Sequence, residues 1–85
     1  MRKYELTIVL DKKSSAAKKK AVVETIGKII KVFNGEIETT LDWGEKEYGI
    51  YVHFVVKLDP SAAKQIAVKM KSEDDIIRYL LVKVE

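Results

Sequence analysis

The spacing of apolar residues constrains this chain most, because it changes between the period of two that is typical of strands and the period of 3.6 that is typical of helices. Three segments alternate, two have helical spacing, and a sixth is apolar on both faces. The strand segments are residues 3–10, 36–43, 50–58 and 76–84, and the helical segments are residues 16–33 and 60–71. The sequence therefore predicts the order strand, helix, strand, strand, helix, strand.

Each of the first five predicted elements has one apolar face. In the strands, these faces are Tyr4, Leu6, Ile8 and Leu10, then Ile37, Thr39, Leu41 and Trp43, then Ile50, Val52, Phe54, Val56 and Leu58. In the helices, they are Val22, Ile26, Ile29, Ile30 and Phe33, and then Ala63, Ile66, Ala67 and Met70. The outward face of the third strand is expected to carry Tyr51, His53, Val55 and Lys57. These faces predict one modest core.

The helix boundaries carry recognisable signals. Ser14 or Ser15 is expected to cap the first helix, and Asn34 followed by glycine supplies a left-handed stop. Asp59 followed by proline predicts the start of the second helix, with a capping carboxylate and then proline at the first helical position. The boundaries agree with the periodicity.

Two split βαβ units of this length predict an α+β fold. The expected architecture is a ferredoxin-like βαββαβ sandwich, in which a four-stranded antiparallel sheet carries two helices on one face. The right-handed crossover rule places the first and third strands at the centre of the sheet. The length of 85 residues, the hydrophobic content of 47% and the lack of a linker predict a single domain over residues 1–85.

The other face of such a sheet is open to solvent, and apolar residues fall on it. Val9, Tyr51 and Val55 are expected there. The last strand adds either Tyr79 and Leu81 or Leu80, Val82 and Val84, because its sequence leaves open which set points inward. An exposed apolar patch is typical of a partner surface. Simple tolerance of apolar residues at strand ends is an equal alternative.

Charge is unevenly distributed along the chain rather than extreme. Sixteen basic and thirteen acidic residues give a net charge of +3, a weaker excess than a stand-alone nucleic-acid-binding domain carries. Residues 11–35 hold seven lysines against two acidic residues, whereas residues 36–56 hold one lysine against five. The first stretch is suited to face phosphates, and the second would repel them.

The sequence offers little chemistry for catalysis. The lack of cysteine excludes disulfides and thiolate sites, and the single histidine, His53, is expected to be a surface or interface residue rather than a general base. The adjacent carboxylates Glu73, Asp74 and Asp75 lack the spacing of a calcium loop. We expect no enzymatic activity, no cofactor, no metal and no small-molecule substrate. We also expect no signal peptide and no association with a membrane.

An RNA-recognition module is one alternative, because such modules share this topology and stack bases on strand aromatics. Tyr51 and His53 could serve as platforms. The first strand, however, offers only Thr7 and Val9 outward and no aromatic residue. The alternative is therefore the weaker hypothesis.

Four segments carry a resemblance to a known family. They are Met1-Arg-Lys-Tyr-Glu-Leu-Thr-Ile-Val-Leu10, Asn34-Gly-Glu-Ile-Glu38 with Asp42-Trp-Gly44, Gly49-Ile-Tyr-Val-His-Phe54 with Asp59-Pro60, and Glu73-Asp-Asp-Ile-Ile-Arg-Tyr-Leu-Leu-Val-Lys83. Over nearly its whole length the chain resembles protein six of the bacterial small ribosomal subunit.

The resemblance implies a structural ribosomal protein of the cytoplasm that is monomeric when isolated. It implies binding to the central domain of small-subunit ribosomal RNA, together with ribosomal protein eighteen, by backbone and shape recognition. The family's basic positions correspond to Arg2, Lys3, Arg78 and Lys83, with ordinary solvated charge as the alternative. The expected partner contacts are Trp43, Tyr48, Tyr51 and His53.

Two departures from the family pattern bear on its function. About ten residues are missing between Gly44 and Gly49, where the family has a longer hairpin with a basic loop, and the C-terminal tail of many members is absent. An alternative is therefore a shortened, engineered relative that folds without binding RNA. A free-standing, non-enzymatic interaction module is a third hypothesis.

Overall fold

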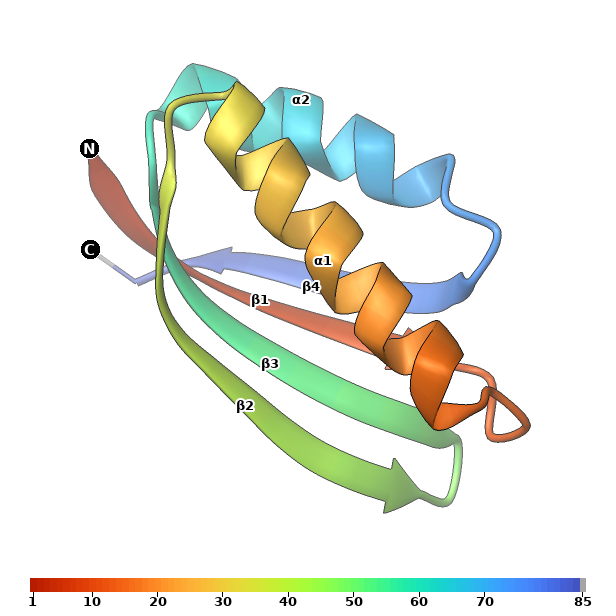
Figure 1. The fold of residues 1–85 in the computed structure, drawn as a ribbon. Helices are drawn as coiled ribbons and strands as arrows, with labels where there is room; N and C mark the ends of the chain where they lie inside the picture. The colour runs from red at the N-terminus through yellow and green to blue at the C-terminus, as the bar shows by residue number, and fades with distance from the viewer. Residues whose placement is uncertain (85) are drawn as a thin grey trace.

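A computed structural model describes residues 1–84 and shows the predicted order of elements. They are β1 (Arg2–Leu10), α1 (Ala16–Val32), β2 (Glu36–Lys46), β3 (Gly49–Leu58), α2 (Pro60–Lys71) and β4 (Ile76–Lys83). The strands form one antiparallel sheet in the order β2-β3-β1-β4, and both helices lie on the same face of it (Figure 1). The predicted ferredoxin-like fold is confirmed, with the first and third strands at the centre.

The core lies between the central strands and the two helices. Leu6, Ile8 and Leu10 of β1 alternate inward, as predicted, and their exposed fractions are 0%. Phe54 is the largest fully buried side chain. Full burial of one such side chain stabilises the fold by about 1.5–3 kcal/mol, so these few positions dominate the stability of a small domain.

Helix α1 is capped at both ends by its own sequence. The Ser15 side chain accepts a hydrogen bond from the Lys18 backbone N–H at 3.1 Å, so Ser15 rather than Ser14 is the N-cap. At the other end Asn34, with φ of 61°, takes the left-handed conformation. The Gly35 N–H then bonds the carbonyl of Ile30 at 2.8 Å, which closes the helix end.

Helix α2 begins at the predicted position but not by the predicted means. Asp59 occupies the N-cap, yet its side chain makes no capping hydrogen bond, so the prediction of a capping carboxylate was wrong. The backbone suffices, because the Asp59 carbonyl accepts the Ala63 N–H at 3.1 Å and Pro60 fixes the first helical φ. Ala62 is buried in place of Ala67, which is only half-buried.

Strand β2 departs from a simple alternation, because its register with β3 shifts at two β-bulges. Ile37 pairs with Val56 on the helix-covered face, but after the first bulge Leu41 pairs with His53 on the open face. Trp43, two residues after Leu41, lies on the open face as well and stacks on His53. The prediction that Ile37, Thr39, Leu41 and Trp43 share one face was wrong for Ile37 alone. Thr39, Leu41 and Trp43 share the open face, because the extra residue of the first bulge changes which face the following side chains occupy.

Asp42 holds the second bulge in place. One of its carboxylate oxygens accepts the Gly44 N–H at 2.8 Å, and the other pairs with Lys19 of α1. The hydrogen bond from Lys19, and after it the one from Gly44, lower the pKa of the Asp42 carboxyl below its ordinary value of 3.8. Gly44 has φ of 77°, a left-handed conformation that glycine adopts at little cost.

The register of β4 settles which of its faces is inward. Leu81 pairs with Leu6 and Tyr79 pairs with Ile8, so both face the helices and pack on the core. Leu80 and Val82 lie on the open face, opposite Thr7 and Glu5. The open face therefore carries the more exposed set.

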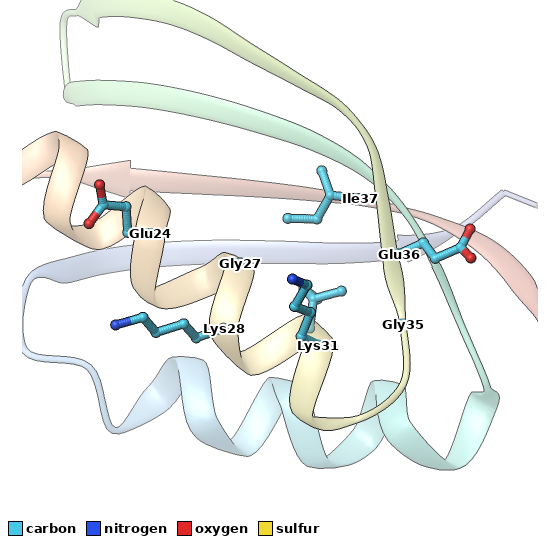
Figure 2. Close-up of a pocket in the computed structure, with 8 residues that line it drawn as sticks. Glu24, Gly27, Lys28, Lys31, Gly35, Glu36 and Ile37 are labelled. Carbon is cyan, nitrogen blue, oxygen red and sulfur yellow. The ribbon is translucent and has the colours of Figure 1, made fainter.

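A hollow of about 640 Å³ lies between α1 and the start of β2. Figure 2 shows Ile37 between the two elements, with Glu24, Lys28 and Lys31 along the helix. Gly27 contributes no side chain, and a Cβ built there would lie 4.0 Å from Ile37 Cδ1. The missing side chain and the mixed charges of the rim make this hollow a packing gap.

No helix within residues 1–84 is long and apolar enough to cross a membrane.

Gly27→Ala is expected to raise the free energy of unfolding by about 0.5–1 kcal/mol, because alanine favours the helix and its methyl group partly fills the hollow. Gly35→Ala at the same hollow should lower it by about 1–3 kcal/mol, because that Cβ would lie 2.5 Å from Leu58 Cδ2. Urea unfolding measures both values. Changes of the same sign in the two variants would contradict this description of the packing.

Asp42→Asn is expected to lower the free energy of unfolding at pH 7 by about 0.2–1 kcal/mol, the usual range for an exposed ion pair. The folded pKa of Asp42 lies below the unfolded one, so its stabilisation is complete above about pH 4 and is lost as the pH falls through the folded pKa. Urea unfolding at pH 7 and at pH 3 should therefore show a difference between variant and wild type that shrinks in acid. Asp74→Asn, at an exposed position with no ion pair among the described residues, is the control.

Candidate protein and nucleic-acid interface

The open face of the sheet is the side that neither helix covers (Figure 1). All four strands contribute apolar or aromatic side chains to it. These side chains are Leu41 and Trp43 from β2, Tyr51 and Val55 from β3, Val9 from β1, and Leu80 and Val82 from β4. Leu80 is 61% exposed and Trp43 is 46% exposed. A patch drawn from four strands is a surface that another molecule can cover.

An aromatic stack lies on the β2–β3 side of the open face. The rings of Trp43 and His53 are nearly parallel, at 8°, with their centroids 4.5 Å apart. His53 Nδ1 also lies 2.8 Å from the Thr7 hydroxyl on β1. Although His53 faces the open side as predicted, it is only 7% exposed, because Trp43 covers it.

The four predicted partner contacts do not all lie together. Tyr51 is half-buried on the open face, opposite Gly44, and so lies beside Trp43 and His53. Tyr48 lies in the turn between β2 and β3 and is 71% exposed. The sequence did not indicate Thr7 as the partner of His53, because that pairing depends on the register between β1 and β3.

The four predicted phosphate contacts fall into two places. Arg2, Lys3 and Lys83 lie at one end of the sheet, where β1 begins and β4 ends. Arg78 is opposite Val9, six residues along β1 from Lys3, a separation of about 20 Å at the usual rise of a strand. None of the four takes part in an ion pair within the described part of the chain. All four therefore have charge that is available to a ligand.

Residues 1–84 contain no group of three or more histidine and carboxylate side chains that is placed to hold a metal ion. In the acidic run before β4, Asp75 forms an ion pair with Lys18 at 3.1 Å. This ion pair links the loop before β4 to the start of α1. His53 Nδ1 is hydrogen-bonded to Thr7, and Trp43 covers the ring, so both contacts hold the imidazole in the open face of the sheet.

The fold of this chain matches the folds of solved structures. The chain superposes on the crystal structure of 30S ribosomal protein S6 from Thermotoga maritima with a TM-score of 0.88, covering 98% of this chain and 87% of that one at 19% identity. It also superposes, at a TM-score of 0.74 and 16% identity, on a chain of the complex between the P2 domain of the chemotaxis kinase CheA and the response regulator CheY from the same organism, covering 98% of each chain. Likenesses at such identities show the fold alone, and this fold hosts unrelated functions.

Sequence comparison relates the chain to one family among the proteins that share this fold. The chain is 31% identical to small ribosomal subunit protein bS6 of Exiguobacterium sibiricum, over all of this chain and 99% of that protein. It is also 31% identical to bS6 of Moorella thermoacetica, over all of this chain and 96% of that protein. Both alignments run over 94 residues, nine more than the chain contains, which is the size of the predicted shortening.

The family model described as Ribosomal protein S6 matches residues 3–83, nearly the whole chain. This match covers both helices and all of the four strands except Arg2, the first residue of β1, and it includes the residues of the stack on the open face. The predicted resemblance is confirmed, and the chain belongs to the ribosomal protein S6 family.

Proposed function

We propose that this chain is a structural component of the bacterial small ribosomal subunit. It binds the central domain of small-subunit ribosomal RNA together with ribosomal protein eighteen, and it catalyses no reaction. The protein is located in the cytoplasm, on the ribosome, and it is monomeric when isolated. The observation that carries the proposal is the family match over residues 3–83, joined to an apolar sheet face that the chain leaves uncovered.

The open face is the contact for the partner protein. Trp43, Tyr51 and His53 lie together on it, and Leu41 is 45% exposed beside them. Aromatic side chains of this kind supply large contact areas with few rotatable bonds, and they dominate the binding energy of many interfaces. Tyr48, in the adjoining turn, contacts the rim of the same partner.

The sheet end that holds Arg2, Lys3 and Lys83 is the contact for the RNA backbone. Three cations without ion-pair partners among residues 1–84 lie at this end, on neighbouring strands β1 and β4. Cations at a rigid strand end fix position against phosphates and read no sequence. Arg78 belongs to a separate contact because of its distance along the sheet.

Replacing Arg2, Lys3 and Lys83 by glutamine together is expected to weaken RNA binding and to make it less sensitive to salt. Removing the charge that faces one phosphate should lower the slope of log affinity against log salt by about 0.7–0.9, so the slope of the triple variant should fall by about two. Binding of a central-domain RNA fragment, with and without ribosomal protein eighteen, over a salt series measures this.

The matched control replaces Lys20 of α1 and Lys69 and Lys71 of α2 by glutamine, which changes the net charge by the same amount in the parts of the helices that lie away from that sheet end. An equal reduction of slope in both triple variants would contradict the assigned contact. Lack of RNA binding by the unaltered chain in either condition would support the alternative of a shortened scaffold.

Trp43→Ala is expected to weaken association with ribosomal protein eighteen by about 2 kcal/mol or more, as truncation of a central aromatic side chain does at many interfaces. The fold should survive, because Trp43 is 46% exposed on an edge strand. Titration calorimetry of the two proteins measures the effect. Val68→Ala is the control, because Val68 is 67% exposed but lies on α2, away from the open face. Comparable weakening in both variants would exclude the open face as the contact.

A further inference from the structure

The position of His53 depends on a residue of the neighbouring central strand. Thr7 and His53 are direct partners in the pairing of β1 with β3, and their side chains meet on the open face with 2.8 Å between Thr7 Oγ1 and His53 Nδ1. A buried imidazole with one nitrogen bonded in this way has a fixed ring plane. His53, at 7% exposed, therefore offers one defined flat surface to its other neighbour.

That other neighbour is Trp43, whose backbone is itself fixed. Asp42 pairs with Val52 and Gly44 with Tyr51, so Trp43 is the extra residue of the bulge. The carboxylate of Asp42 holds the bulge through the Gly44 N–H. The indole lies flat against the imidazole, with 8° between the planes. One face of the indole is thus covered by His53, while Trp43 as a whole stays 46% exposed.

We propose that Thr7 and His53 are positioning residues of the partner surface, which hold the Trp43 indole in the orientation that ribosomal protein eighteen recognises. This inference rests on the proposed function. Thr7 acts through His53, and His53 acts through Trp43. A tryptophan on an edge strand would otherwise exchange between rotamers and would have to be ordered on binding, which lowers affinity. The stack removes that ordering step.

The composition of the chain makes the stack directly observable. His53 is the only histidine and Trp43 is the only tryptophan. The ring current of the indole shields protons that lie over its face, so the carbon-bound imidazole protons of His53 should resonate upfield of those of a free histidine. In Thr7→Val the shape of the side chain is kept but its hydroxyl is removed, and these resonances should move toward the free position.

Two further variants complete the test. Thr7→Ser restores a hydroxyl and should restore the shielded resonances, which a purely structural effect of the substitution would not explain. Thr40→Val makes the same change on β2, at a position paired with Phe54 on the helix-covered face, and should leave the His53 resonances in place. Far-ultraviolet circular dichroism checks that every variant is folded.

Binding to ribosomal protein eighteen supplies the second measurement. Thr7→Val should bind about three- to tenfold more weakly than the unaltered chain, the cost of ordering one side chain, and Thr7→Ser should recover most of that affinity. Unshifted His53 resonances in Thr7→Val, or wild-type affinity despite shifted ones, would overturn this inference and leave the proposed function intact. Lack of binding by the unaltered chain would overturn both.

Discussion

Two helices can cover only one face of a four-stranded sheet, and this limit organises the rest of the molecule. On the covered face β1 and β3 bury an almost unbroken row of aliphatic and aromatic side chains, including Leu6, Ile8 and Phe54. The chain is too short to build a third layer. Apolar side chains on the other face consequently stay accessible, and this face is where a partner can be bound.

The sequence predicted the covered face better than the open one. Periodicity located all six elements, and the central strands alternate as expected because both have neighbours on each side. The faces of β2 were predicted wrongly, because bulges add residues without changing the local composition. The inward face of β4 needed the register with β1, since both faces of that strand are apolar.

In the candidate site, too, the sequence indicated the residues but not the contacts between strands. The sequence indicated Trp43 and His53 as partner contacts, but their stacking needs the first bulge of β2, which turns Trp43 to the open face. The hydrogen bond between Thr7 and His53 joins residues 46 positions apart, and no local pattern predicts it. Charges were easier to identify than to place, because residues that resemble family positions were found at opposite ends of the sheet.

The described ends of the chain lie side by side, because β1 starts where β4 finishes and the Val84 N–H bonds the Lys3 carbonyl at 2.8 Å (Figure 1). A purification tag or fluorescent domain fused at either end would therefore emerge beside Arg2, Lys3 and Lys83 and would crowd the proposed RNA contact. The loop of residues 72–75 between α2 and β4 lies at the opposite end of the sheet. A label attached there would leave that sheet end and the aromatic stack uncovered.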